Sequence, residues 1–233
     1  MKFLIVYRGN CNRYTNLDLF FKNFLLKIKN PLNLNGHEFD CALFTYQNET
    51  SYCDAFIKLF NPKFVKLFSY SNQKDQFISI LKFLNSKILD EYDKIIFLRF
   101  DICYKMNIMK WDFFDKKGIF FPFKEDSQEF FEKEKLHGDV IIICDTCYML
   151  KLTQILEKYA SESNIYGFPH FPYNMLHFIP KLLNNLIPVY NLIDGFFQSN
   201  TQLELEDKRI NPLYIIMYKV YNFSDFYLLE TKD

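Results

Sequence analysis

The sequence predicts an α/β protein with a mostly parallel central sheet flanked by helices. Through about the first hundred of its 233 residues, short apolar runs alternate with longer segments of helical periodicity. The apolar runs have hydrophobic residues on both faces, which is typical of strands in a parallel sheet that is covered on both sides. Hydrophobic residues make up 49% of the chain and no Pro-, Gly- or Ser-rich linker interrupts it, so we predict a single domain over residues 1–233.

Four strands alternate with three helices up to Asp101. The predicted strands cover residues 3–7, 39–45, 64–68 and 94–98. The predicted helices cover residues 16–29, 52–60 and 73–89. The first helix has apolar residues three or four positions apart, and Asn30-Pro31 is expected to end it. Because each helix connects two strands, we expect right-handed crossovers between parallel strands.

The pattern changes after Asp101. Strands are predicted at 118–123, 139–143 and 187–190, and helices at 146–159 and 172–183. A charged stretch at 124–135 is expected to form a mobile loop or a surface helix. If the stretch has a function, we expect it to be a lid that closes over bound ligands. The last forty residues are irregular and aromatic, and we expect them to wrap the sheet.

Charge and cysteine usage narrow the class of protein. The 28 basic and 28 acidic residues cancel, so no basic excess favours nucleic acid or an anionic membrane. Only five apolar residues separate Met1-Lys2 from Arg8, too few for a signal peptide, and no apolar run approaches the length of a membrane span. We therefore expect a cytoplasmic protein whose six cysteines are reduced.

The predicted strand at 94–98 ends in Arg99-Phe100-Asp101. A buried strand normally excludes charge, because an unpaired charge in a low dielectric is costly. Two opposite charges at its carboxyl end therefore indicate a site, since ligands bind at that end of the strands in open α/β sheets. Asp101 can hold a divalent metal, and Arg99 can bind a phosphate or orient Asp101. The structural alternative is an Asp101 that caps a turn and pairs with Arg99.

Polar residues also follow the first two predicted strands. Arg8, Gly9 and Arg13 come after the first strand, where nucleotides dock in α/β sheets. Glycine lets a ligand approach the backbone closely, and arginine forks suit diphosphate oxygens, although a solvated loop is the alternative. Thr45 and Tyr46 end the second strand, and Tyr46 can stack on a base.

Further candidates lie in the second half of the chain. Asp139 precedes a predicted strand, where a turn residue is the structural alternative. His137 lies beside it. His170 and His177 are seven residues apart, and a surface or half-buried histidine is the structural alternative for each of them.

The order of these motifs resembles that of bacterial and viral glycosyltransferases with a GT-A fold, which build capsules and lipopolysaccharides. In several such families an Arg-Phe-Asp-Leu/Ile step looks like the counterpart of the usual Asp-x-Asp. The resemblance implies a GT-A-like (Rossmann-like) domain with a nucleotide-binding half, 1–101, and an acceptor-side half, 102–233. It covers about residues 1–190 and depends on Arg8-Gly9-Asn10, Arg13, Phe44-Thr45-Tyr46, Arg99-Phe100-Asp101, Gly138-Asp139 and Met149.

The resemblance also implies an activity. A sugar would move from a nucleotide diphosphate-sugar donor to a hydroxyl of a glycan or lipid-linked acceptor, as in polysaccharide biosynthesis. Asp139 would be the general base of an inverting enzyme, and Mn²⁺ or Mg²⁺ would neutralise the leaving diphosphate. A true Asp-x-Asp is absent, so the metal requirement stays open. The implied roles are nucleotide and diphosphate binding by Arg8, Gly9, Arg13, Thr45 and Arg99, and metal binding by Asp101 and a late histidine, His177 or alternatively His170. His137 can share the general-base role of Asp139.

Two other functions stay open at this point. One is a non-catalytic α/β module that binds a nucleotide or a glycan inside a larger assembly. The other is a thiol-disulfide oxidoreductase that uses Cys144 and Cys147. This Cys-x-x-Cys pair follows an apolar strand and opens a predicted helix, whose N-terminus would lower a thiol pKa. Two small, half-buried structural residues are the simpler alternative for the pair.

Overall fold

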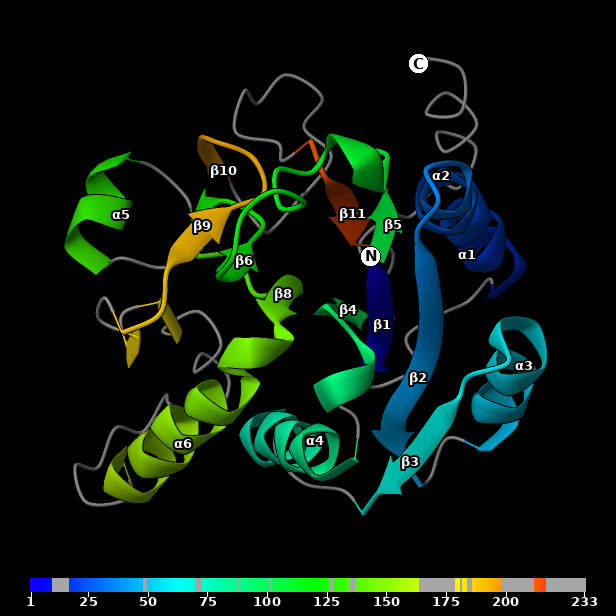
Figure 1. Ribbon diagram of the computed structural model, residues 1–233, viewed down its shortest axis with the longest axis horizontal. Helices are drawn as coiled ribbons and strands as arrows, with labels where there is room; N and C mark the ends of the chain where they lie inside the picture. The colour runs from blue at the N-terminus through cyan, green and yellow to red at the C-terminus, as the bar shows by residue number, and fades with distance from the viewer. Residues whose placement is uncertain are drawn as a thin grey trace.

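Seven strands form one mixed sheet with helices on both of its faces (Figure 1). The strand order is β3-β2-β1-β4-β8-β6-β9, and most neighbouring pairs are parallel. The predicted α/β class with a mostly parallel, helix-flanked sheet is therefore confirmed. The computed structural model describes residues 1–9, 17–47, 50–69, 73–87, 89–100, 102–125, 128–134, 137–163, 179–180, 182–183, 186–197 and 212–216.

The first half of the chain forms the parallel part of the sheet. The central strand β1 (Lys2–Arg8) lies between β2 (Glu38–Tyr46) and β4 (Lys94–Arg99), and β3 (Phe64–Phe68) pairs with β2. All four predicted strands are confirmed to within one residue at either end. The register pairs Arg8 with Arg99, so β1 and β4 end level at the same edge of the sheet.

The second half adds strands of both directions. β8 (Ile141–Asp145) is antiparallel to β4 and to β6 (Ile119–Phe121), and β9 (Val189–Asn191) is parallel to β6. Because β8 runs against β4, the residues that precede β8 lie at the edge where β1 and β4 end. Two short ladders join β7 (Lys124–Glu125) to β10 (Phe196–Phe197) and β5 (Ile102–Tyr104) to β11 (Tyr214–Ile216).

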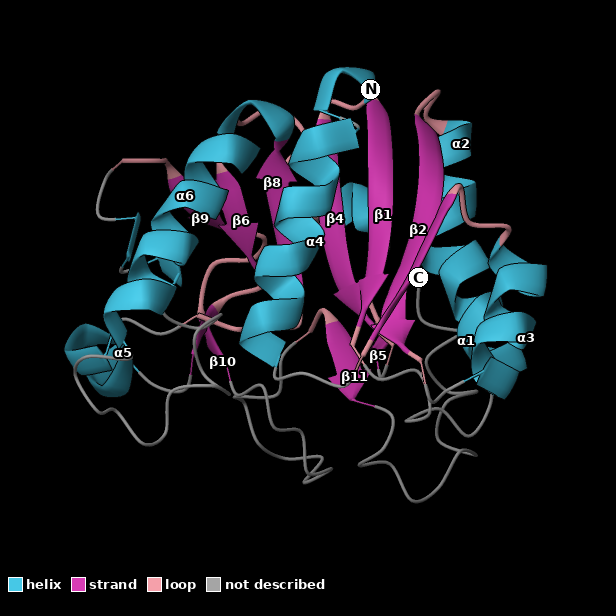
Figure 2. Ribbon diagram, turned by 90° about the horizontal axis from the view of Figure 1, so that it is seen from below, coloured by secondary structure: helices cyan, strands magenta, loops and turns pink. Residues whose placement is uncertain are grey.

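The helices form two layers, one on each face of the sheet (Figures 1 and 2). The layer over one face consists of α1 (Leu17–Phe24), the π-helical turn η2 (Leu25–Lys29), α2 (Asn30–Leu34) and α3 (Thr50–Phe60). The other face is covered by α4 (Gln73–Lys87) and α6 (Thr146–Ser163). The short elements are η3 (Leu89–Glu91), η4 (Ile108–Lys110) and α5 (Gln128–Glu134).

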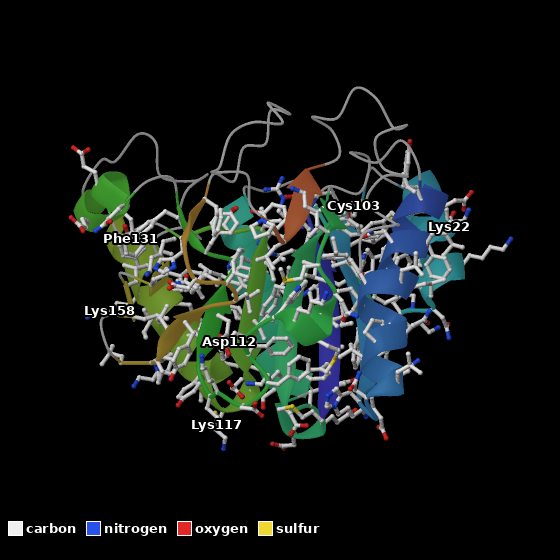
Figure 3. The ribbon with its side chains drawn as sticks, turned by 90° about the horizontal axis from the view of Figure 1, so that it is seen from above. Lys22, Cys103, Asp112, Lys117, Phe131 and Lys158 are labelled. Carbon is white, nitrogen blue, oxygen red and sulfur yellow. The ribbon has the colours of Figure 1, made fainter. Side chains whose placement is uncertain are left out.

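Each face of the sheet has its own hydrophobic core. Alternate residues of β1 point to opposite faces, so Phe3 and Ile5 join one core while Leu4 and Val6 join the other. This division explains why the strands have apolar residues on both faces. Figure 3 shows side chains filling the space between sheet and helices, while the exposed Lys22 and Lys117 project outward.

The sequence predicted that the first helical segment would end at Asn30-Pro31. This prediction is wrong, because the helical segment continues past Pro31. The Asn30 amide bonds to the Leu25 carbonyl in the π-helical turn, and α2 then continues to Leu34. Pro31 lies in the first turn of α2, where a missing N–H is tolerated. Leu32 is buried in the core, so its burial favours continuation of the helix past the proline.

Other predicted elements have mixed outcomes. Within the charged stretch 124–135, the surface-helix alternative is confirmed as α5. The predicted helix at 172–183 lies outside the described residues up to 178, and 179–180 and 182–183 are helical. Most of the last forty residues also lie outside the description. Among the described helices, none combines the length and apolar character needed to cross a membrane.

Candidate functional site

Three charged residues meet at the edge where β1 and β4 end. Arg8 is only 5% exposed, and its Nη2 donates a 2.7 Å hydrogen bond to the backbone carbonyl of Asp139. The Arg99 Nη1 lies 3.9 Å from Asp139 Oδ1, and the Arg99 side chain is 19% exposed. The Arg99 guanidinium lies near the Asp139 carboxylate, whereas Arg8 bonds to the Asp139 backbone carbonyl. Counted alone, these three side chains carry two positive charges and one negative charge, and an excess of positive charge at a partly buried position favours an anionic ligand.

The position of Arg8 is supported from α4. The guanidinium carbon lies 5.4 Å from the centre of the Phe77 ring, within the range of a cation–π contact. Phe77 in turn packs edge-to-face against Phe97 of β4, with 5.1 Å between ring centres. The aromatic contact restrains the long Arg8 side chain. Sequence reasoning missed Phe77, because an apolar residue in an amphipathic helix carries no signal of such a contact.

The segment before β8 delivers Asp139 to this edge. Gly138 donates its amide hydrogen to the Phe123 carbonyl at 3.2 Å, and a Cβ on Gly138 would lie 3.3 Å from the Phe123 ring. Only a residue without a side chain therefore fits there without displacing its neighbours. β8 begins at Ile141, two residues later than predicted, so Asp139 lies in the approach to the strand rather than in its ladder.

His137 is a second restrained polar group beside Asp139. Its side chain is buried, and Nδ1 lies 2.8 Å from Asn191 Oδ1 at the end of β9. The rings of Phe121 and Phe131 lie 5.4 Å and 5.1 Å from the imidazole. Asn191 was missed by sequence reasoning, although it is a polar residue at a strand end, the same signal that singled out Arg99.

The remaining nucleotide-binding candidates differ in what surrounds them. Gly9 has a φ of +103°, and a Cβ there would meet no described atom within 4 Å. Its backbone conformation, rather than crowding, therefore favours glycine. Thr45 lies inside β2 and is fully buried, one residue beyond the level of Arg8. Arg13 lies outside the described residues.

The predicted metal ligands Asp101 and His177 also lie outside the described residues, as does His170. Within the part of the chain that is described, no three His, Cys, Asp or Glu side chains are grouped so that they could hold a metal ion. Among the described residues, the Asp139 carboxylate lies beside the Arg99 guanidinium. Guanidinium groups suit anions such as phosphates rather than cations.

The predicted Cys144–Cys147 pair does not have the environment of a reactive dithiol. Cys144 lies in β8 and is fully buried, and burial raises the pKa of its thiol well above the usual value. Helix α6 begins at Thr146, so only Cys147 lies in its first turn, where it is exposed. The described cysteines are all free thiols. The geometry argues against disulfide exchange at Cys144.

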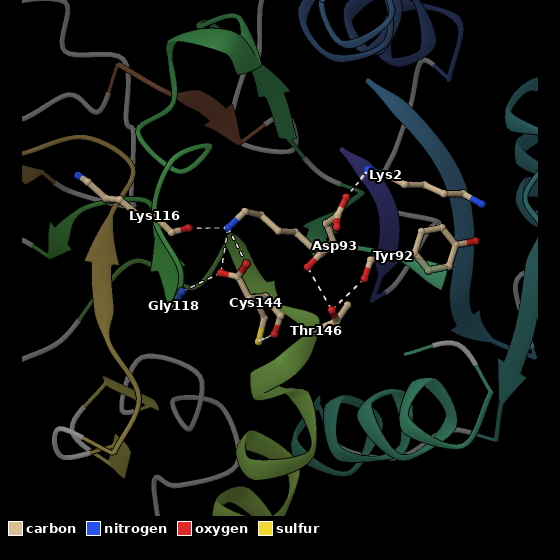
Figure 4. Close-up of polar contacts among 9 residues, drawn as sticks. Lys2, Tyr92, Asp93, Lys116, Gly118, Cys144 and Thr146 are labelled. Carbon is tan, nitrogen blue, oxygen red and sulfur yellow. Dashed lines mark hydrogen bonds and ion pairs between the residues drawn. The ribbon is translucent and has the colours of Figure 1, made fainter. Parts of the chain in front are cut away.

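A buried ion pair lies at the opposite edge of the sheet (Figure 4). Lys94, the first residue of β4, is 1% exposed, and its Nζ lies 2.8 Å from both carboxylate oxygens of Asp145 and 2.7 Å from the Lys116 carbonyl. Asp145 also accepts a 2.7 Å hydrogen bond from the Gly118 amide. The two charges satisfy each other, which indicates a structural role.

Comparison with known proteins does not assign the chain to a family. No protein-family model matches the chain, and no curated protein is significantly similar to it in sequence. The functional interpretation therefore depends on the fold and on the cluster of Arg8, Arg99 and Asp139.

Proposed function

We propose that the protein is a glycosyltransferase that moves a sugar from a nucleotide diphosphate-sugar donor to a hydroxyl of a glycan or lipid-linked acceptor. The observation that carries the proposal is the meeting of Arg8, Arg99 and Asp139 at the carboxyl edge of two adjacent parallel strands. In open α/β sheets this edge is where ligands bind. A mixed, helix-flanked sheet also suits the GT-A-like domain that the motif order resembles.

The charges suit the bonds that the reaction changes. An acceptor hydroxyl oxygen attacks the anomeric carbon, and the bond between that carbon and the diphosphate oxygen breaks. The nucleoside diphosphate leaves with the electron pair, where Arg8 and Arg99 would stabilise its growing negative charge. The hydroxyl proton passes to the Asp139 carboxylate if the enzyme inverts the anomeric carbon.

The proposal assigns neutralisation of the diphosphate to the two arginines. A contribution from Mn²⁺ or Mg²⁺ through Asp101 and His177 stays a prediction from the sequence. A metal bound there would supply Lewis-acid stabilisation of the same leaving group.

The test begins with thermal unfolding in the presence of nucleoside diphosphates, with and without Mn²⁺. A ligand at about 100 times its Kd stabilises the folded state by about 2.7 kcal/mol, which raises Tm by several degrees. The Arg99→Met variant should bind the same nucleotide about 10- to 100-fold more weakly, because a hydrogen bond to a charged group is lost. Lys117→Met, which removes an exposed charge from a loop outside the cluster, is the matched control.

Donor turnover decides between transfer and mere binding. Release of nucleoside diphosphate from a nucleotide-sugar supports the transferase. Binding without any turnover, for each donor and acceptor class tried, favours the non-catalytic module. The absence of a response to every nucleotide would overturn the proposal.

A further inference from the structure

Gln76 is a buried polar side chain near the start of α4. It is 2% exposed, and no described residue accepts a hydrogen bond from its Nε2. An unsatisfied buried donor destabilises a protein, whereas an apolar side chain of the same shape would not. Such groups are rare in folded proteins and often mark a functional site. A hydrogen-bond acceptor that comes from outside the chain would resolve the anomaly.

The direction of α4 places Gln76 close to the carboxyl edge of the sheet. The helix follows β3, so its first turns lie at the edge where the parallel strands end. Gln76 is the immediate neighbour of Phe77, whose ring supports the Arg8 guanidinium. Helical side chains lean toward the N-terminus of their helix, and for Gln76 that end of α4 lies at the carboxyl edge of the sheet.

Gln76 is displaced sideways from the two arginines. It shares a helical face with Phe83, seven residues further on. The Phe83 ring lies 5.6 Å from Phe44 of β2 and 6.3 Å from Phe64 of β3. This face of α4 is therefore directed toward β2 and β3, whereas Arg8 and Arg99 end β1 and β4. A ligand that reaches both must extend along the edge of the sheet.

We propose that Gln76 binds the nucleoside part of a nucleoside diphosphate whose phosphates bind Arg8 and Arg99. This inference rests on the proposed function. The Gln76 amide donates from Nε2 to an acceptor oxygen of the base. A neutral amide suits a neutral base oxygen, whereas a phosphate is bound more strongly by a charged donor such as arginine. The side chain then contributes to the choice of base, while the arginines bind the part that all nucleotides share.

Asn85 Oδ1 and Trp111 Nε1 are also buried without a described hydrogen-bond partner, but both lie away from this edge. Asn85 Oδ1 is nine residues further along α4, where its Nδ2 donates to Thr153 Oγ1 of α6 at 2.6 Å. Trp111 Nε1 lies in the core on the other face of the sheet. Gln76 differs from both because it lies near the carboxyl edge of the sheet, in the first turn of α4.

The test compares the full-length protein with Gln76→Met, which keeps a similar side-chain volume. Calorimetric titration measures Kd for UDP, CDP, GDP, ADP and inorganic pyrophosphate. We expect the preferred nucleotide to bind Gln76→Met about tenfold more weakly, since one hydrogen bond is lost, while the Kd for pyrophosphate stays within about twofold. Without ligand, the variant should melt at a higher temperature, because the unsatisfied donor is gone.

A matched control and a second variant complete the design. Asn85→Ala, on the same helix, should lower Tm without changing any Kd, because its amide bonds to Thr153. If Gln76→Met fails to fold, Gln76→Asn, which keeps the amide but withdraws it, should show the same selective loss of nucleotide binding.

The outcomes separate this inference from the proposed function. Equal affinity of wild type and Gln76→Met for the preferred nucleotide would overturn the role of Gln76 alone. An equal loss for pyrophosphate would show that Gln76 acts on the phosphates or on the fold, and would also overturn it. If the wild-type protein binds no nucleotide, the proposed function fails and this inference fails with it.

Discussion

Replacing Lys94 with methionine tests the idea that the buried ion pair with Asp145 secures the two halves of the sheet. Lys94 and Asp145 are directly paired residues of β4 and β8, the two strands at which the parallel and mixed parts meet. The methionine side chain has a similar length and no charge. It removes every donor that Lys94 supplies and leaves the Asp145 carboxylate in place.

The expected loss of stability follows from the contacts that Lys94 makes. Lys94→Met deletes both hydrogen bonds to the carboxylate and the one to the Lys116 carbonyl, so Asp145 keeps only the Gly118 amide among the partners described above. Removing one partner of a buried ion pair destabilises by about 3–5 kcal/mol, because the other charge stays buried. This is a large fraction of the roughly 5–15 kcal/mol that stabilises a typical domain.

Urea unfolding followed by fluorescence measures this loss. The chain has one tryptophan, Trp111, which is 2% exposed and should change its emission on unfolding. The double variant Lys94→Met/Asp145→Leu should recover at least half of the lost free energy, because no lone charge remains. Lys116→Met, which breaks a surface pair with Asp112, is the control and should cost less than about 1 kcal/mol. A loss below about 1 kcal/mol for Lys94→Met, or a double variant no better than the single, would refute the reasoning.

Three further outcomes are expected. Asp139→Asn keeps an oxygen toward Arg99 but cannot act as a general base. The variant should lower the rate of sugar transfer about 10²- to 10⁴-fold and leave donor affinity within about twofold. Equal losses in rate and affinity would indicate a positioning role instead. Burial lowers the pKa of Lys105 to about 8 from an ordinary value of 10.5, so from pH 8 to 10 the unfolded chain binds more protons at this group than the folded protein does. The free energy of unfolding of the wild-type protein should therefore rise with pH relative to that of Lys105→Met. Parallel pH profiles of the two proteins would contradict this. Iodoacetamide at pH 8 followed by peptide mapping should label the exposed Cys147 and spare the buried Cys144, whose raised pKa keeps it protonated; rapid labelling of both would revive the dithiol alternative.

The parallel half of the fold was predictable from the sequence because burial on both faces leaves a plain pattern. Every side chain of β1 from Phe3 to Val6 is apolar and buried, so this part of the strand shows no polar residue on either face. The direction of β8 could not be predicted, since a short buried run has the same composition whichever way it points. The end of the first helix was predicted wrongly from Pro31, because the π-helical turn before this proline depends on tertiary packing and has no sequence signal.

The candidate site was predictable only in part. Arg8, Arg99 and Asp139 each carried a local signal, charge next to a buried strand, but no local signal joined them. Their meeting depends on strand order and on the antiparallel course of β8. Gln76 had no signal at all, because a glutamine at a helix start is ordinary until the docking of α4 buries it.

The antiparallel entry of β8 has a consequence for how the protein assembles. The hydrogen bond from Arg8 to Asp139 spans 131 residues of the chain. It is a non-local contact, and closing a loop of that length costs chain entropy. The hydrogen bond can therefore form only once β8 has docked against β4, so the edge of the parallel half is completed by residues from the other half of the chain.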